Sequence, residues 1–215
     1  MGKALLAITA VMRYNSFKQD SECFLYAGAN SKRGSNMKTL KTDRLILRGF
    51  RKSDLNDFYE YAKNPRVGPP AGWEPHASLQ MTKSILKVFM EQDEVWAIVL
   101  RENKKVIGSV GLHKDEKRPD IHGKMLGYAL SEDYWGRGLM TEAVKEVIAF
   151  AFCHDKLDIL SVYHYPHNER SCRVIEKCGF VREGVLRSCS RIYNGVVMDN
   201  VCYSMLKAEY KRLYE

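Results

Sequence analysis

The chain has 215 residues, a formal net charge of +8, 45% hydrophobic residues and 28% charged residues. These values are typical of a globular protein with a single core, and no run of residues is long and apolar enough to cross a bilayer. Lys and Arg are scattered, often beside Asp or Glu, and the sequence lacks basic patches interleaved with aromatic residues. The composition argues against a membrane or a nucleic acid as direct partner, and it is compatible with a basic groove for an anionic cofactor.

Residues 1–36 are interpreted as an N-terminal extension. Lys3 and the apolar residues after it resemble the start of a secretory signal, but the polar segment SFKQDSEC separates them from the cleavage-like Ala27-Gly28-Ala29. We therefore expect no export and a cytoplasmic protein. The polar run KRGSN precedes Met37, and we hypothesise that Met37 is the natural start, which makes 37–215 the folded domain.

The cysteines form no CxxC pair and no Cys/His grouping with the spacing of metal ligands. We expect free, mostly buried thiols in a reducing compartment, and no metal. The six residues are Cys23, Cys153, Cys172, Cys178, Cys189 and Cys202.

Hydrophobic spacing and turn residues predict the elements in chain order. The first half contains a strand at 45–48, a helix capped by Ser53-Asp54 and ending near Tyr61, a Pro/Gly-rich loop at 64–76, a helix capped by Ser78 and ending near Met90, and a hairpin of strands 95–100 and 106–112. The second half contains a charged loop at 114–120, a strand ending at Leu130, a helix over 139–152, a strand at 159–163, a helix over 168–178 that ends at Gly179-Phe180, and strands 185–193 and 196–206 joined by Asn194-Gly195. This order predicts an α+β fold with helices on a mostly antiparallel sheet.

The turn Gly136-Arg137-Gly138 opens the long helix that follows Leu130. Glycines allow the backbone to approach a ligand closely, and the N–H groups in the first turn of a helix lack partners within the helix. The turn therefore predicts an anion site suited to a pyrophosphate. The apolar residues of the helix are Leu139, Met140, Ala143, Val144, Val147, Ile148, Ala151 and Phe152.

Several segments in the right order resemble the GNAT superfamily of acyl-CoA-dependent N-acyltransferases, and within it the Rim-type branch of ribosomal-protein N-terminal acetyltransferases. The segments are TDRLILRGF, VIGSVGL, YWGRGLMTEA, and NERSCRVIEKCGF with EG four residues later, and the resemblance covers Thr39 to Tyr210. It implies a mixed, mostly antiparallel sheet flanked by helices, acetyl-CoA as co-substrate, and no metal.

The cofactor motif of this superfamily, Q/R-x-x-G-x-G/A, maps onto Trp135 to Met140. Only Gly138 fits strictly, because Trp135 replaces the polar first residue, as is usual in the Rim-like branch, and Met140 replaces the small last residue. The resemblance implies that the amides from Arg137 to Thr141 hold the pyrophosphate of coenzyme A. The full set of implied cofactor contacts is Tyr128, Ala129, Leu130, Gly136, Arg137, Gly138, Leu139, Met140, Thr141 and Asn168.

The resemblance also implies that the strands on either side of the long helix, here 127–130 and 160–163, splay apart and admit the pantetheine arm. The family has a bulge in the first of these strands, and Gly127 is suited to it. A free amide at Ala129 or Leu130 would then donate to the thioester oxygen as it becomes an oxyanion.

Many relatives protonate the leaving thiolate with a Tyr in the last helix, but the matching position here is Ile175. The Rim-like branch has N-x-x-S instead, present as Asn168 and Ser171. We expect Ser171 to protonate or hydrogen-bond the thiolate and Asn168 to contact pantetheine; the alternative is that both residues only cap the helix. The general base is left open among Glu142, Tyr128, His164, His167 and a water chain, and Glu142 is better explained as a first-turn acid.

The acceptor pocket is expected between the early helices and the final hairpin, lined by Pro69, Pro70, Trp73 and His76, although Trp73 could equally anchor its loop. The predicted function is direct acetyl transfer from acetyl-CoA to a primary amine, such as a protein N-terminus, an amino acid, a polyamine or an antibiotic. The alternative is a catalytically idle acyl-CoA sensor on the same fold. The sequence is also compatible with a homodimer.

Overall fold

The structure, a computed structural model, describes residues 37–214. The expectations for the N-terminal extension, for Met37 as natural start and for Cys23 therefore rest on residues that lie wholly or partly outside the described part of the chain.

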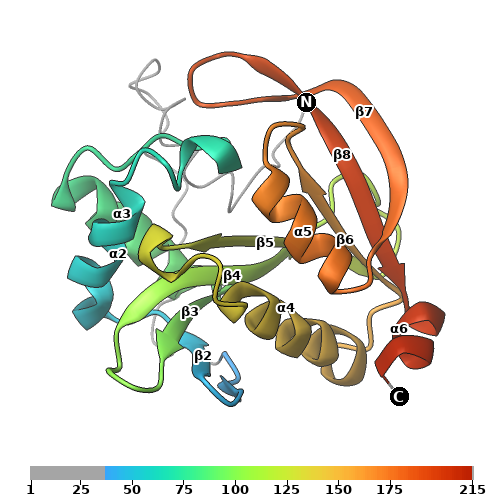
Figure 1. Ribbon diagram of the computed structural model, residues 1–215, viewed down its shortest axis with the longest axis horizontal. Helices are drawn as coiled ribbons and strands as arrows, with labels where there is room; N and C mark the ends of the chain where they lie inside the picture. Colours follow the sequence, from blue (N-terminus) through green and yellow to red (C-terminus); the bar gives the residue numbers. More distant parts are fainter. Residues whose placement is uncertain (1–36, 215) are drawn as a thin grey trace.

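Within residues 37–214, eight strands form one sheet in the order β1-β2-β3-β4-β5-β6-β8-β7 (Figure 1). All neighbouring pairs are antiparallel except β5 and β6, which are parallel. The strands are β1 (Leu40–Lys41), β2 (Leu45–Gly49), β3 (Val95–Leu100), β4 (Val106–Lys114), β5 (Gly123–Leu130), β6 (Ile159–His164), β7 (Val181–Arg191) and β8 (Val197–Leu206). The mostly antiparallel sheet confirms the α+β prediction.

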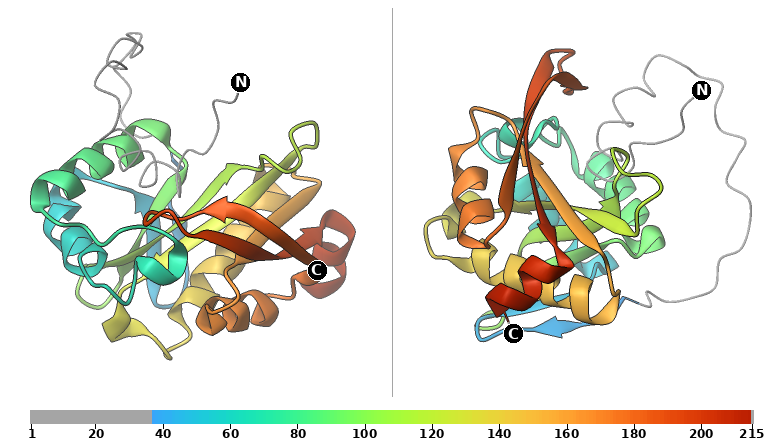
Figure 2. Two further views of the ribbon diagram at one scale, coloured as in Figure 1. Left: turned by 90° about the horizontal axis from the view of Figure 1, so that it is seen from above. Right: turned by 90° about the vertical axis from the view of Figure 1, so that its right-hand side faces the viewer.

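Helices cover both faces of the sheet. Accordingly, strand β3, which lies between β2 and β4, is apolar and buried at every position. Trp96, Ile98 and Leu100 pack in the core beneath α4 and α5, whereas the intervening residues of β3 pack beneath α2 and α3. The long hairpin of β7 and β8 extends beyond this body (Figure 2). The helices are α2 (Leu55–Ala62), α3 (Leu79–Gln92), α4 (Leu139–Ala149), which continues through a π turn (Phe150–His154), α5 (Glu169–Lys177) and α6 (Lys207–Tyr214).

Several local predictions are confirmed by the geometry. The hydroxyl of Ser78 accepts a hydrogen bond from the amide of Met81 and caps α3. Asn168 caps α5, and this helix ends at Gly179, where φ is 77° and the amide of Phe180 reaches back to the carbonyl of Ile175. The eight apolar residues predicted to face inward from the long helix are all buried.

Other predictions are wrong in detail. Gly127 makes no bulge, because the β4–β5 register runs unbroken through the pair Gly111 and Gly127. Asp54 stands at the N-cap of α2, but its carboxylate binds Arg48 at 2.7 and 2.8 Å rather than capping the helix. The final hairpin turns through three residues, Tyr193 to Gly195, between the hydrogen-bonded Ile192 and Val196.

The structure differs from the sequence predictions in two further respects, the helix at the C-terminus and the burial of the cysteines. Helix α6 follows β8 without a loop, and its residues lie beyond the last predicted strand, which ends at residue 206, where no element is predicted. Of the five cysteines in the described residues, Cys178 and Cys202 are buried and the others are exposed or half-buried, so the expectation of mostly buried thiols is only partly met; all five are free.

Candidate active site

The parallel strands β5 and β6 part after three residue pairs. Pairing joins Gly123, Lys124 and Met125 to Ile159, Leu160 and Ser161, and it stops there. Beyond this point the end of β5 and the end of β6 form opposite walls of a cleft of about 350 Å³. This separation confirms the predicted splay and leaves strand edges without a partner strand inside the cleft.

A third side of the cleft is formed by the N-terminus of α4. Gly136 and Gly138 adopt positive φ angles of 75° and 74°, and the Cβ of an added side chain would meet open space at Gly136 and only one atom, at 3.7 Å, at Gly138. The turn therefore needs glycine for its left-handed backbone rather than for room. No side chain caps the helix, so the first-turn N–H groups from Leu139 to Thr141 stay available to an anion.

The β4–β5 ladder determines which amides of β5 face the cleft. The amide of Ser131 donates to the carbonyl of Ile107 at 2.7 Å, in step with the unbroken register. Because amide direction alternates along a strand, Ala129 points its N–H toward β4, whereas Tyr128 and Leu130 point theirs toward the gap beside β6. Of the two amides predicted as oxyanion donors, the geometry favours Leu130 over Ala129.

Every predicted cofactor residue except Arg137 lines this cleft. The Arg137 guanidinium lies 5.2 Å from the ring centre of Tyr134, and its carbonyl accepts a hydrogen bond from Arg44. Four other cationic side chains contribute to the lining and suit a polyanionic ligand: Arg66, Arg170, Arg173 and Lys177. Together with the free amides, they form a donor set that fits the diphosphate of a coenzyme A thioester.

Trp135, which replaces the polar first residue of the cofactor motif, is held from two sides. Its indole N–H donates to the carbonyl of Leu130 at 2.9 Å, and the Arg170 guanidinium lies 4.3 Å above its ring. The side chain therefore fixes the end of β5 against the turn that leads into α4.

Ser171 lines the cleft and pairs with Tyr128. The two hydroxyl oxygens are 2.8 Å apart, and the Tyr128 hydroxyl also lies 3.2 Å from the carbonyl of Ser171. Burial raises the pKa of Tyr128 above its ordinary value, and the hydrogen bond with Ser171 offsets part of this effect. Tyr128 is therefore protonated at neutral pH and remains a hydrogen-bond donor.

Asn168 also lines the cleft, and its side-chain amide is engaged at both ends. The oxygen Oδ1 accepts from the amide of Ser171 at 3.1 Å, and Nδ2 donates to the carbonyl of Pro70 at 2.9 Å. Asn168 thus ties the loop before α3 to the start of α5 across the cleft. A contact between Asn168 and pantetheine stays a prediction.

The predicted base candidates differ in their surroundings. Thr42 and Arg44 donate hydrogen bonds to the Glu142 carboxylate. Burial alone would raise the pKa of Glu142, but these hydrogen bonds and the charge of Arg44 outweigh burial, and the pKa is lowered. His167 is exposed, stacks on Tyr165 and lies outside the cleft lining. His164 lines the cleft, and its Nδ1 bonds the carbonyl of Tyr165.

A second, smaller pocket of about 60 Å³ lies beneath α2 and α3 and shares Ala71, Gly127, Tyr128 and Ala129 with the cleft. The predicted acceptor residues Trp73 and His76 line this pocket rather than the cleft. Trp73 is buried and packs on Gly68, which supports its reading as a loop anchor. Pro70 lines the cleft, and Pro69 lines neither space.

Sequence reasoning missed a histidine in the smaller pocket. His113 on β4 is 7% exposed, and its Nδ1 lies 3.5 Å from the Glu94 carboxylate. The two residues are nineteen positions apart, so only the β3–β4 register could have revealed the pair. The alternation of residues along β4, which places His113 on the same face as Gly111, was the available signal.

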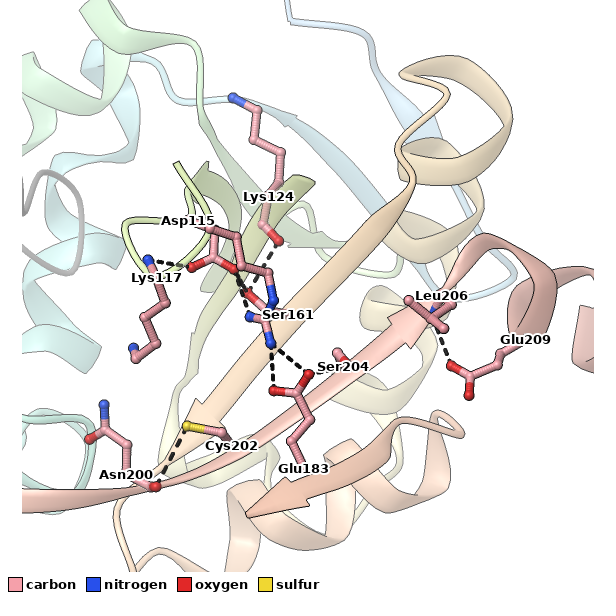
Figure 3. A network of polar contacts seen from close by, with 11 residues as sticks. Asp115, Lys117, Lys124, Ser161, Glu183, Asn200, Cys202, Ser204, Leu206 and Glu209 are labelled. Atoms are coloured by element: carbon pink, nitrogen blue, oxygen red, sulfur yellow. Dashed lines mark hydrogen bonds and ion pairs between the residues drawn. The ribbon is translucent and has the colours of Figure 1, made fainter. Parts of the chain in front are cut away.

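A polar network, buried at Asp115, Ser161 and Ser204, fastens the sheet where β5 and β6 begin to part (Figure 3). Ser161, in the last paired position of β6, donates to the Asp115 carboxylate at 2.7 Å, and Arg118 joins Asp115 to Glu183 on β7. Ser204 on β8 donates to Glu183 at 2.8 Å. The loop between β4 and β5 is therefore bound to β6, β7 and β8 at the closed end of the cleft.

Burial alone would raise the pKa of Asp115, but hydrogen bonds from Ser161, Arg118 and the Lys117 amide hold it below its ordinary value. Among the described residues, no group of three or more His, Cys, Asp or Glu could hold a metal ion. None of the helices within 37–214 has the length and apolarity needed to cross a membrane.

Comparison with known proteins places this geometry in a family. The profile of the family described as "Acetyltransferase (GNAT) domain" matches residues 44–181. The chain is also 30% identical over 176 residues to the uncharacterised N-acetyltransferase YoaA of Bacillus subtilis (strain 168), an alignment that covers 78% of this chain and 96% of YoaA. The chain belongs to the GNAT acetyltransferases, and it is an acyl-CoA-dependent N-acyltransferase.

Other relatives support the Rim-type assignment. The chain is 28% identical to the [ribosomal protein uS5]-alanine N-acetyltransferase of Escherichia coli (strain K12), over 67% of this chain and 79% of that enzyme. The ribosomal-protein-S5-alanine acetyltransferase of Vibrio fischeri has a solved structure with a TM-score of 0.65 and 25% identity, covering 80% of this chain and 98% of that one. A GNAT-family acetyltransferase from Bacillus anthracis, at 24% identity and a TM-score of 0.71, matches the fold over 80% of this chain and all of its own.

Proposed function

We propose that this enzyme transfers the acetyl group of acetyl-CoA to the primary amine of an acceptor, with a protein N-terminus as the preferred class. The observation that carries the proposal is the convergence of two features on one cleft, the splayed ends of β5 and β6 and the uncapped N-terminus of α4. The first suits an extended arm with amide groups, and the second suits a diphosphate. The relative that acts on ribosomal protein uS5 supports a protein N-terminus as acceptor.

The residues of the cleft suggest a division of work. The first-turn amides of α4 would bind the diphosphate, and the amide of Leu130 would donate to the thioester oxygen as it gains charge in the transition state. Ser171 would donate its proton, or a hydrogen bond, to the departing sulphur, while Tyr128 supports it at 2.8 Å. Direct attack by the amine needs no covalent enzyme intermediate.

The same proposal places the protein in the cytoplasm and leaves a homodimer as an expectation. The five described cysteines are free, which suits a reducing compartment. Exposed apolar side chains on β7 and β8, among them Val185, Leu186 and Val197, would be the surface to examine for self-association.

A catalytically idle acyl-CoA sensor is the second candidate, because one observation favours it. By the family resemblance, Ile175 occupies the position where many relatives carry the Tyr that protonates the thiolate. The Ile175 side chain is completely buried. If neither Ser171 nor Tyr128 acts, this cleft has binding groups but no proton donor at that place.

Purified protein incubated with acetyl-CoA and a panel of amines separates the two. The panel contains peptides beginning with Ala, Ser and Met, the same peptides with blocked N-termini, spermidine, and free amino acids. Release of free thiol, together with a mass increase of one acetyl group on an unblocked peptide, is the expected result. Tight binding of coenzyme A without turnover on any amine would support the sensor, and failure to bind coenzyme A would overturn both candidates.

A further inference from the structure

The pocket beneath α2 and α3 contains buried polar groups that the cleft does not use. The Nε2 atom of His76 and the hydroxyl of Tyr61 are buried without a hydrogen-bond partner among the described residues, and both side chains are only 2% exposed. Ser109 is close enough to the Tyr61 hydroxyl to affect its pKa, but the pair has no hydrogen bond of ordinary geometry. A buried polar group left unpaired is costly, so such a pocket is built to hold water or a polar ligand group.

The hydrogen bonds around His76 determine which of its ring nitrogens carries the proton. Thr82 donates its hydroxyl hydrogen to the carbonyl of Ser78 at 3.2 Å, so its oxygen accepts from Nδ1–H of His76 at 2.9 Å. The Nε2 atom that lines the pocket is therefore the lone-pair nitrogen. Burial lowers the pKa of His76 to about 4, so this nitrogen is an acceptor of hydrogen bonds that stays uncharged at neutral pH.

His113 lies in the same pocket and has a carboxylate partner. With Nδ1 directed at Glu94, the Nε2 atom is the free position of the ring. This end of the ring lies over Gly111, because a Cβ added there would come within 2.8 Å of Cε1 and 2.9 Å of Nε2 of His113. Gly111 pairs with Gly127 on β5, so two residues without side chains form the floor between the imidazole and the cleft.

The pocket and the cleft adjoin each other along β5. Both are lined by Gly127, Tyr128 and Ala129, and the cleft wall continues to Leu130, whose amide faces the proposed thioester oxygen. A volume of about 60 Å³ is large enough for water, to which His76 and Tyr61 would offer hydrogen-bond partners. The proton of an acceptor ammonium placed beside the thioester would reach His113 through water in this pocket.

We propose that His113, held by Glu94, is the general base that receives the proton of the acceptor ammonium through water in this pocket. The proposal rests on the proposed acetyl transfer. The ammonium gives one proton to Nε2 of His113, and the freed nitrogen lone pair forms the C–N bond as the C–S bond breaks. Ser171 passes its hydroxyl proton to the sulphur and takes up a second proton from the nitrogen, the third stays on the amide, and the imidazolium returns its proton to solvent.

The other titratable groups around the pocket do not compete in the neutral range. Tyr61 from α2 and Tyr128 from β5 have pKa values raised by burial, and that of His76 from the loop before α3 is lowered to about 4. Glu94, at the start of β3, is the charged residue in contact with His113.

The test is the pH dependence of kcat/KM with acetyl-CoA and the best unblocked peptide of the panel. His113→Asn keeps a donor toward Glu94 but removes Nε2, so we expect kcat to fall at least about thirtyfold and the acidic limb of the profile to disappear. His154→Asn, at an exposed histidine paired with Asp155, is the matched control and should keep the wild-type profile. The dissociation constant of coenzyme A should be unchanged in both variants.

Two further variants keep the test decisive if His113→Asn fails to fold. Glu94→Gln removes the anion that stabilises the imidazolium, so the acidic limb should move to lower pH. His164→Asn tests the rival histidine of the cleft. An acidic limb that survives in His113→Asn or does not move in Glu94→Gln, or a limb lost only in His164→Asn, overturns the proposal. These outcomes need turnover by the wild-type protein, so they are distinct from failure of the proposed function itself.

Discussion

The hydroxyl of Tyr128 on β5 and the hydroxyl of Ser171 on α5 meet at 2.8 Å across the mouth of the cleft. The pair joins a strand and a helix that are forty-three residues apart in the chain. It places two hydroxyl groups in the lining of the cleft, whereas Ile175, one turn further along α5, is buried in the core.

Replacing Ser171 by Ala should lower kcat at least about tenfold, because the departing thiolate loses its proton donor, while the dissociation constant of coenzyme A changes little. Free-thiol release under saturating acetyl-CoA measures the effect. Ser84→Ala, on the exposed side of α3, is the matched control. An unchanged kcat would remove Ser171 from the mechanism and leave its hydroxyl as a structural partner of Tyr128.

Tyr128→Phe should lower kcat by about tenfold while keeping Ser171 in place, because the Ser171 hydroxyl loses its partner but not its position. Tyr59→Phe on α2, outside both pockets, serves as control. Single-turnover kinetics separate this effect from product release. If Tyr128→Phe changes only the thermal midpoint of unfolding, its hydroxyl is structural.

Gly138→Ala should weaken coenzyme A binding at least about tenfold. The residue has a φ of 74°, which costs an L-amino acid roughly 1–2 kcal/mol, and relief of this strain would turn the first-turn amides of α4 away from the ligand. Calorimetric titration with coenzyme A measures the loss. Gly195→Ala in the final hairpin, at a φ of 85°, carries comparable strain away from the turn, and it should bind coenzyme A as the wild type does.

Arg118→Ala should lower the free energy of unfolding by about 3 kcal/mol, because it leaves the buried Asp115 carboxylate without its cationic partner. The midpoint of urea denaturation at neutral pH reports the loss. In an Asp115→Asn background the same substitution should cost clearly less, since the charge that needs the partner is gone. Arg187→Ala, an exposed site on β7, provides the control. Equal losses in both backgrounds would contradict the coupling.

The free energy of unfolding should depend on pH through His76. Its pKa is lowered to about 4 in the folded protein, so the unfolded chain binds the proton more readily. The stabilisation by neutral His76 is complete above about pH 6.5 and is lost as the pH falls toward 4. It amounts to at most about 3 kcal/mol, at 1.36 kcal/mol per unit of pKa shift. Urea denaturation between pH 7 and 4 measures the slope. In His76→Gln this part of the slope should vanish.

The sequence was sufficient to predict the order of elements and the cofactor turn, because both depend on local signals. The apolar spacing from Leu139 to Phe152, the caps at Ser78 and Asn168 and the stop at Gly179 each involve a few neighbouring residues, and all are confirmed. The family resemblance added the splay of β5 and β6, which the pairing confirms.

Contacts that depend on strand register were beyond the sequence. His113 and Glu94 meet because β3 and β4 pair in one register, and Asp115 meets Glu183 through Arg118 because β8 lies between β6 and β7. The expected bulge at Gly127 failed for the same reason. Gly127 instead pairs with Gly111, and the absence of a side chain at Gly111 makes room for the His113 ring.

The separation of β5 from β6 after Met125 leaves backbone donors and acceptors that only a guest molecule can satisfy. Occupancy by the thioester should therefore slow hydrogen exchange at the amides of Tyr128 and Leu130 and protect the chain from protease. The free energy of unfolding should then rise with the concentration of the acyl donor, so that substrate supply and resistance to degradation are coupled in this fold.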